Sequence, residues 1–319
     1  MKNSIFKTLS FRLGLCTIVT IILVGIIGTF VKKAKYDKVT HLSKTILKVE
    51  LNNKVGVINR LGNAIIQPKY DDIYLLEDNG MLKVGNPSDT LLRVKLGNKF
   101  GIVDTQGNVI IEPKYDDVSL FEGDNVFEVV INDKHGCINK NGQVVVEIKY
   151  EQLRSLSSKE LVAVKFNRTW GYVNISENGK EIIKPQFDEV SSFEEGLAYI
   201  KKSGKYGFID KAGKLVIEPK FDYVYKFSDD LAAVEINKEW GFIDKTGTVV
   251  IDLKYDMVGP FSEGLGAVLI DRRWAYIDKT GKIVIDPKYV SARPFSKGKA
   301  IVSIDDKELT IDKMGKEIQ

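Results

Sequence analysis

The side chains that could support catalysis or hold a metal ion are few and widely separated in this sequence. The 319-residue chain has two histidines, His41 and His135, and two cysteines, Cys16 and Cys137. A nucleophilic triad needs a base beside its nucleophile, and a structural zinc site needs several cysteine or histidine ligands grouped together. His135 occupies an otherwise aromatic position, which favours a packing role. The sequence therefore predicts no catalytic residue, no metal site and no bound cofactor.

Carboxylates and glycines are abundant, but they recur at fixed positions. Aspartates such as Asp244 and Asp278 precede a Lys-x-Gly turn, where a short acidic side chain usually caps the turn. The glycines are spread one per turn and form no phosphate-binding loop, and no calcium-binding pattern of alternating acids is present. A pair of carboxylates of the glycosidase type stays open as an alternative, although no residue is singled out for it.

Positions that differ between copies are better candidates for specific function than positions that recur in every copy, because recurring residues report the fold. Three stretches differ: the insertion Glu77–Leu92, the turn with Arg272 and Arg273, and the turn with Asn167 and Arg168. We predict Arg272, Arg273, Asn167 and Arg168 as candidate interaction loops. The alternative for each of them is an ordinary solvated loop.

These turns belong to a repeat that organises most of the chain. A glycine next to an aromatic residue marks each copy, and the last four copies lie 34 residues apart. A fixed period of this length indicates stacked supersecondary units. Counting the copies gives eight units of about 34 residues. The marker residues are Gly56, Gly101, Gly136, Gly171, Gly207 and Gly241, then Ala275 and Leu309.

Each unit has the pattern of a β-meander. In one copy, apolar strands are predicted at 231–236, 240–244 and 248–251. The turn Asn237-Lys238 has residue types that tolerate positive φ, as a two-residue hairpin requires, and Gly247 closes the second turn. A connector follows, in which Pro-Lys-Tyr-Asp recurs. We expect this connector to contain a short fourth strand that returns along the sheet, so that the next unit can begin at the correct end.

Both faces of each predicted sheet are apolar, so each sheet is expected to lie between two neighbours. The fold class is therefore all-β, with the units arranged as a β-propeller-like ring or, alternatively, as an open superhelical β-solenoid. We favour the ring because it removes exposed end units. Trp240 is predicted to be the packing residue between sheets, with Gly241 leaving a gap for a neighbouring ring. Trp240→Ala would then cost about 3–5 kcal/mol.

The recurring motif resembles that of a known family. A Trp-Gly-(Tyr/Phe)-(Ile/Val) core is followed by x-Gly, a β-branched run, Pro-Lys-Tyr-Asp and Phe-x-x-Gly, and all three tryptophans, Trp170, Trp240 and Trp274, lie at one position of it. This pattern is similar to that of the WG repeat (KWG) family of bacterial proteins, over residues 45–319. The resemblance implies a β-repeat interaction module, and it transfers no catalytic residue.

The N-terminal segment has the pattern of a membrane anchor. Residues 13–31 carry no charge and would span about 28 Å as a helix, close to the thickness of a bilayer core. We predict a short basic tail at 1–12, a single transmembrane helix at 13–31, a linker at 32–44 and the repeat domain at 45–319. A cleaved signal peptide, which would give a secreted protein, and a buried core helix are the alternatives. We expect the repeat domain to lie outside the cell membrane.

The charge balance limits the class of partner. Residues 1–31 carry three basic residues and no acidic one, so the rest of the chain is close to neutral, which argues against nucleic-acid binding. We expect a membrane-anchored, non-catalytic module of a bacterial cell envelope that binds protein or polysaccharide. The alternatives are an enzyme with a site in a central channel and a purely structural spacer.

Overall fold

The computed structural model describes residues 35–76, 90–122, 126–156, 160–305 and 307–318. The chain divides into two compact units, residues 1–144 and 145–319. The predicted transmembrane residues 13–31 and most of the insertion Glu77–Leu92 lie outside the described residues. In the described part of the chain, no helix is long and apolar enough to cross a membrane.

The described residues form β-strands in eight sheets and one short 3-10 helix, η2 (Ile175–Glu177). Unit 1 contains the first sheet, the second sheet and the first three strands of the third. Their strands are β1 (Lys38–His41), β2 (Ile46–Leu51), β3 (Lys54–Asn59) and β4 (Ala64–Tyr70); β5 (Asp72–Leu75), β6 (Leu91–Leu96), β7 (Lys99–Asp104) and β8 (Val109–Tyr115); and β9 (Asp117–Glu122), β10 (Val126–Ile131) and β11 (Lys134–Asn139). The next strand of the chain, β12 (Val144–Tyr150), begins at the boundary between the units.

Unit 2 contains the fourth to eighth sheets. The fourth and fifth consist of β13 (Gln152–Ser155), β14 (Leu161–Phe166), β15 (Thr169–Asn174) and β16 (Lys180–Phe187), and of β17 (Glu189–Val190), β18 (Leu197–Lys202), β19 (Lys205–Asp210) and β20 (Leu215–Phe221). The sixth consists of β21 (Tyr223–Val224), β22 (Ala232–Ile236), β23 (Glu239–Ile243) and β24 (Val249–Tyr255). The seventh and eighth consist of β25 (Leu265–Ile270), β26 (Arg273–Asp278) and β27 (Ile283–Tyr289), and of β28 (Ser291–Ala292), β29 (Lys299–Ile304) and β30 (Lys307–Asp312).

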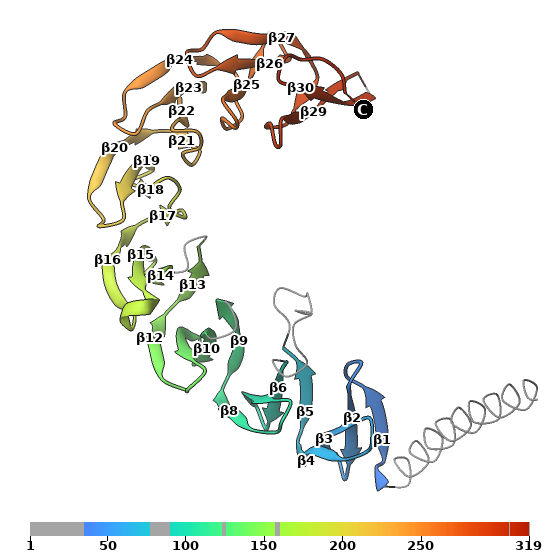
Figure 1. Ribbon diagram of the computed structural model, residues 1–319. Helices are drawn as coiled ribbons and strands as arrows, with labels where there is room; N and C mark the ends of the chain where they lie inside the picture. Colours follow the sequence, from blue (N-terminus) through green and yellow to red (C-terminus); the bar gives the residue numbers. More distant parts are fainter. Residues whose placement is uncertain (1–34, 77–89, 123–125, 157–159, 306, 319) are drawn as a thin grey trace, which may run out of the picture. The chain divides into compact units, whose positions relative to one another are not determined.

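Within a sheet the strands are antiparallel and follow chain order, as β17, β18, β19 and β20 show (Figure 1). This is the predicted β-meander. The short strand predicted in the connector exists, but it does not return along its own sheet. It is the first strand of the next sheet: β21 follows β20 directly and pairs with β22. Likewise β1 lies in the stretch interpreted as a linker and pairs with β2, so the first sheet begins before residue 45.

Both predicted turn types are confirmed. Asn237 and Lys238 have φ values of 53° and 70°, so the hairpin between β22 and β23 is built from two left-handed residues. Gly247 has φ 86° and closes the turn between β23 and β24. Asp244 caps this turn: one of its oxygens, Oδ1, accepts hydrogen bonds from the backbone N–H groups of Thr246 and Thr248 at 2.9 and 3.0 Å. The recurring aspartates therefore stabilise turns.

Consecutive sheets pack face to face, as the apolar pattern on both faces predicted. The contact is built on an aromatic pair that recurs in unit 2. Phe242 of β23 is fully buried, and its ring centroid lies 4.8 Å from that of Phe261, which precedes β25. Equivalent pairs lie 4.9–5.1 Å apart: Phe208–Phe227, Tyr276–Phe295 and Tyr172–Phe193. The second aromatic of the motif is therefore a packing residue between sheets. The tryptophan position also contacts these cores but is buried to different degrees, since Trp170 is 5% exposed and Trp240 is half-buried.

The glycine beside the aromatic has a different role from the predicted one. Opposite Gly241 the ladder contains a bulge, because Trp240 pairs with Tyr255 whereas Phe242 pairs with Ile251. A Cβ atom on Gly241 would lie 2.5 Å from the carbonyl oxygen of Ile251. The space that glycine leaves is thus filled by the backbone of its own sheet, and not by a ring from a neighbouring sheet.

The aspartate of Pro-Lys-Tyr-Asp links consecutive sheets. Asp222 lies between β20 and β21, pairs with Lys205 of the fifth sheet and accepts a 2.8 Å hydrogen bond from the Asn237 N–H of the sixth. Asp116 makes the same two contacts with Lys99 and with the Asn132 N–H, at 2.6 and 2.7 Å. In both aspartates the lysine, followed by the backbone N–H, lowers the pKa of the carboxyl group.

We expect Asp222→Asn to lower the urea midpoint of unfolding at pH 7 and to weaken its dependence on acid. Because the pKa of Asp222 is lower in the folded chain than its unfolded value of about 3.9, its ionised form stabilises the fold above that pH, and this contribution disappears as the pH falls through the folded pKa. Urea titrations between pH 7 and pH 2 measure the effect. Asp256→Asn is the matched control, because no contact of the Asp256 carboxylate is found among the described residues. Equal acid dependence in the two variants would contradict the prediction.

The eighth sheet departs from the pattern on its outer face. Glu308 and Thr310 occupy the positions held by Trp274 and Tyr276 in the seventh sheet. Glu308 is exposed and pairs with Arg293 at 3.9 Å. This face offers no aromatic residue to another sheet, as is typical of a capping repeat.

Candidate binding groove

Four cavities open at equivalent places, next to the first strand of a sheet and the neighbouring sheet that packs on it. Two lie in unit 1, with volumes of about 240 and 390 Å³, and two lie in unit 2, with volumes of about 230 and 560 Å³. They are concave sites formed by the repeat itself, which makes them candidates for ligand binding.

The largest cavity is lined by aromatic side chains. Tyr199 comes from β18 of the fifth sheet, Tyr223 from β21 of the sixth, and Tyr225 from the residues just after β21. Val258 and Pro260, which precede β25, close the far side. Tyr223 is 46% exposed and Tyr225 is half-buried, so both rings are accessible to a ligand.

The rings continue behind the cavity as a connected set, which we call the aromatic ladder: Tyr199, Tyr206, Tyr223, Tyr225 and Trp240. Tyr225 stacks on Trp240 at 5.1 Å with an interplanar angle of 26°. Tyr206 contacts Tyr199 at 5.7 Å and Tyr223 at 5.4 Å. Offset and edge-to-face contacts of this kind stabilise aromatic rings beyond their burial and fix their orientation. The ladder therefore presents a preorganised surface.

Three tyrosines of the ladder, Tyr199, Tyr206 and Tyr225, have hydroxyls that stay neutral at physiological pH. Burial raises the pKa values of Tyr199, Tyr206 and Tyr225 above the usual 10. The Tyr206 hydroxyl donates a 2.9 Å hydrogen bond to Glu189 Oε2, which occupies that carboxylate. Among the described residues that line this cavity, Glu194 is the one carboxylate.

A smaller, polar cavity of about 230 Å³ adjoins the aromatic one, and Tyr199 and Lys226 line both. Arg154 of β13 lies at its other side, with its guanidinium 4.5 Å from the centroid of the Trp170 ring and one N–H donated to the Val190 carbonyl at 3.3 Å. Ser192 is buried and accepts from the Lys226 ammonium. The two cavities together form one continuous groove, which we call the ladder groove.

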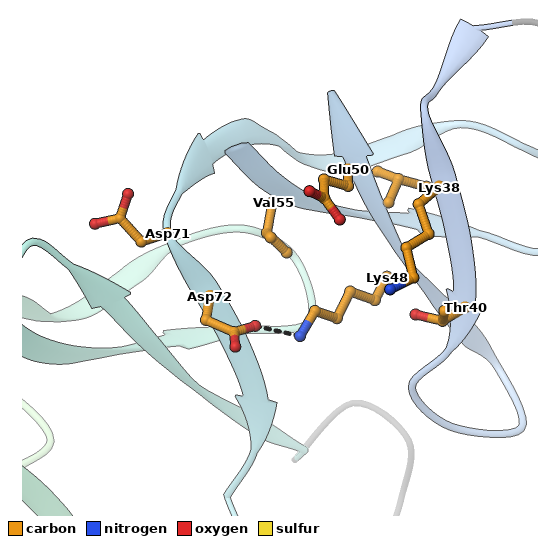
Figure 2. A pocket seen from close by; sticks show the side chains of 8 residues that line it. Lys38, Thr40, Lys48, Glu50, Val55, Asp71 and Asp72 are labelled. Carbon is orange, nitrogen blue, oxygen red and sulfur yellow. Dashed lines mark hydrogen bonds and ion pairs between the residues drawn. The ribbon is translucent and has the colours of Figure 1, made fainter. Parts of the chain in front are cut away.

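In each cavity of unit 1, a basic side chain that lines it is paired with an aspartate. Figure 2 shows the smaller one, where the Lys48 ammonium is paired with Asp72 across the opening. In the other, Arg93 lies over the Phe100 ring at 3.9 Å and pairs with Asp117 at 2.6 Å. Because these cations are already neutralised, the ladder groove is the better candidate site.

The cavities share a position but differ in chemistry because two motif positions vary between repeats. They are the second and fourth residues after the aromatic of Pro-Lys-Tyr-Asp, and the residue between them is always apolar. The second position holds Lys38, Asp72, Asp117, Gln152, Glu189, Tyr223, Met257 and Ser291, and the fourth holds Thr40, Tyr74, Ser119, Arg154, Ser191, Tyr225, Gly259 and Arg293. The apolar residue between them is buried in most sheets. Residues at the two variable positions contribute to every cavity, as Thr40 and Asp72, Tyr74 and Ser119, Arg154 and Ser191, and Tyr223 and Tyr225 do.

A family model now accounts for the repeat. The model described as "WG containing repeat" matches seven consecutive segments: residues 56–100, 100–134, 136–170, 170–206, 206–240, 240–274 and 274–307. The chain belongs to the WG repeat family. The matches confirm the resemblance seen in the sequence motif. They also correct the predicted count of eight repeats to seven. Each matched segment runs from the strand with the Trp-Gly position in one sheet to the same strand in the next, so seven segments extend from β3 to β30.

Solved structures resemble this WG repeat protein only weakly. Hsv2p of Kluyveromyces lactis is 13% identical, with 75% of this chain and 92% of that chain covered and a TM-score of 0.38. Sqt1 of Saccharomyces cerevisiae is 10% identical, with 88% and 94% covered and a TM-score of 0.35. PorZ of Porphyromonas gingivalis, a surface component of the type-IX secretion system, is 9% identical, with 87% and 45% covered and a TM-score of 0.29. A search of the curated proteins finds no match.

The residues predicted from sequence as interaction loops lie elsewhere in the WG repeats. Asn167 and Arg168 form the exposed turn between β14 and β15, and Arg272 precedes Arg273 at the exposed start of β26. The Arg168 N–H donates to Glu151 at 3.2 Å, so this turn also links sheets. The structure brings none of these four side chains into the ladder groove. The signal that identifies the groove is the variation at the two positions after Pro-Lys-Tyr-Asp.

Two of the residues considered for catalysis, His135 and Cys137, lie in β11. His135 is 30% exposed at its side chain, and its Nδ1 lies 2.7 Å from Glu128 Oε1 on the neighbouring strand. Cys137 is buried and is not part of a disulfide. Across the described ranges, no group of three or more histidine, cysteine, aspartate or glutamate residues is arranged to hold a metal ion.

Proposed function

We propose that this WG repeat protein is a non-catalytic binding module, anchored to a bacterial cell membrane by residues 13–31, with its repeat domain presenting inter-sheet grooves to protein or polysaccharide outside the cell. The observation that carries this proposal is the series of equivalent cavities whose lining varies from repeat to repeat while the packing residues stay constant. A scaffold with constant packing and a variable lining is suited to recognition.

The ladder groove favours binding over catalysis and over a purely structural role. Glu194 lines the groove and is paired with Lys226, and Glu189, which is not among the lining residues, accepts from the Tyr206 hydroxyl, so the two do not form an acid–base pair. A spacer has no need for an exposed Tyr223 ring at an edge where other repeats hold polar residues. Clustered aromatic rings at an accessible concave surface are the usual composition of a binding site.

Retention of envelope material tests the binding function. We expect the full chain, purified in mild detergent, to retain a component of solubilised cell-envelope extract, and the double variant Tyr223→Ala/Tyr225→Ala to lose it. Arg168→Ala is the matched control, since it removes an exposed side chain of the same repeat array outside the groove. Retention that is unchanged in the double variant, or lost in the control, would overturn the assignment of the groove.

Fractionation tests the anchor and its orientation. We expect the full chain with a C-terminal tag to sediment with membranes and to lose the tag when protease is added to intact cells. The physical reason is the uncharged length of residues 13–31, which matches a bilayer. A tag in the culture medium would indicate cleavage, and a protected tag would reverse the orientation.

A further inference from the structure

We infer that the ladder groove binds an acidic polysaccharide, with sugar rings stacked on the aromatic ladder and a carboxylate of the chain bound by Arg154. This inference rests on the proposed binding function and names its ligand class. Three properties of the groove support it: one half is lined by aromatic side chains and the other by polar ones, Arg154 has no anionic partner among the described residues, and the edge strands beside the groove are short.

The aromatic half of the groove fits the apolar faces of sugar rings. Tyr223 and Tyr225 present accessible rings held by contacts to Tyr206 and Trp240, at 5.4 and 5.1 Å. A pyranose has a face of C–H groups that packs on such a ring, and hydroxyls around its rim that need hydrogen-bond partners. Tyr223, Tyr225 and Lys226, which line the groove, supply those partners through their hydroxyl and ammonium groups.

The polar half carries a cation with no anionic partner. Arg154 is exposed, and no carboxylate lies within ion-pair distance of it among the residues that the structure describes. Its stacking on Trp170 holds the planar guanidinium in place and leaves N–H donors available for a carboxylate, which arginine binds in a bidentate manner. Lys226, by contrast, has Glu194 at 3.7 Å. The groove therefore has a net positive charge located at Arg154, which complements one carboxylate beside a run of sugar rings.

A peptide is the competing occupant, and the strand edges argue against it. Peptides that bind in extended form add a strand to an exposed edge, where main-chain hydrogen bonds supply much of the affinity. The first strands that line the groove, β13, β17 and β21, have only four, two and two residues. They offer too short a ladder for that mode. The rings and the arginine remain as the recognition elements.

Defined oligosaccharides test the inference on the full chain in mild detergent. We expect an oligogalacturonate of about six residues to quench tryptophan fluorescence and to bind more tightly than a neutral cello-oligosaccharide of the same length. Arg154→Gln should weaken oligogalacturonate binding about tenfold and remove its salt dependence, while the binding of the neutral oligosaccharide stays unchanged. Tyr223→Ala should weaken the binding of both, and Arg168→Gln, the charge-matched control, should weaken neither. Thermal unfolding of each variant verifies its folding.

The outcomes separate this inference from the proposed function. If neither oligosaccharide binds while Tyr223→Ala still abolishes the retention of envelope material, the ligand is of another class, such as a peptide, and the present inference is overturned alone. If the neutral oligosaccharide binds as tightly as the acidic one and Arg154→Gln has no effect, the acidic specificity is overturned. If no ligand binds and envelope retention is insensitive to Tyr223, the proposed function fails as well.

Discussion

Phe242→Ala is expected to lower the free energy of unfolding by about 3–5 kcal/mol, the range found when a fully buried aromatic residue is truncated to alanine. Phe242 is 0% exposed and lies edge-on to Phe261, with the two ring planes at 76°. The substitution removes the central contact between the sixth and seventh sheets. It also leaves a cavity that two β-sheets cannot close by small shifts of side chains.

Trp240→Ala is the informative comparison. The sequence analysis assigned the large loss to Trp240, but Trp240 is only half-buried and packs mainly on Tyr223 and Tyr225 beside the groove. We therefore expect a smaller loss of stability than for Phe242→Ala, together with a loss of ligand binding. Urea unfolding followed by far-UV circular dichroism measures both variants. A loss for Trp240→Ala equal to or larger than that for Phe242→Ala would show that the tryptophan is the packing residue after all.

The local structure of each repeat was predictable because short-range chemistry determines it. The pair Asn237-Lys238 and the glycine Gly247 adopt left-handed backbone conformations that their own residue types favour. The strand positions follow from the same turns and from the alternation between them. The sheet to which the connector strand belongs was not predictable in this way. The residues of β21 could pair with the preceding sheet or with the following one, and packing between sheets decides that they pair with β22 of the following sheet.

The ladder groove is lined by residues from several repeats. It could therefore not be predicted from the pattern of any single turn. Tyr206 of the fifth sheet and Tyr223 of the sixth meet only when these two sheets stack. Each of them also contacts a ring of its own sheet, Tyr199 and Trp240 respectively. The variable positions predicted from the sequence all lie in exposed turns, as Arg272 does. In a stack of sheets the edge strand is equally accessible, and its two variable positions face a concave surface. Variation next to a constant apolar residue was the available signal.

The second large loss of stability is expected when the glycine of the Trp-Gly position is replaced. We expect Gly207→Val to lower the free energy of unfolding by about 3 kcal/mol, the upper part of the range for overpacking a buried site. A Cβ on Gly207 would lie 2.4 Å from the carbonyl oxygen of Ile217 and 2.7 Å from the nitrogen of Pro219, and both atoms belong to the backbone of β20. Relief would require the bulge between Tyr206 and Phe208 to open, with loss of the pairing around it.

Two natural exceptions in the same chain sharpen this prediction. Ala275 holds the position in the seventh sheet with the same register across β26 and β27, so a single methyl group can be accommodated there. Leu309 holds it in the eighth sheet, where the described residues that follow β30 form an isolated bridge between Ile311 and Glu317 and no full strand. The stability lost on urea unfolding should therefore increase from Gly207→Ala to Gly207→Val, and Ala275→Gly should be close to neutral. If Gly207→Val lost less than about 1 kcal/mol, the close approach of β20 could not be the reason for glycine at this position, because a branched side chain cannot occupy that space without moving the strand.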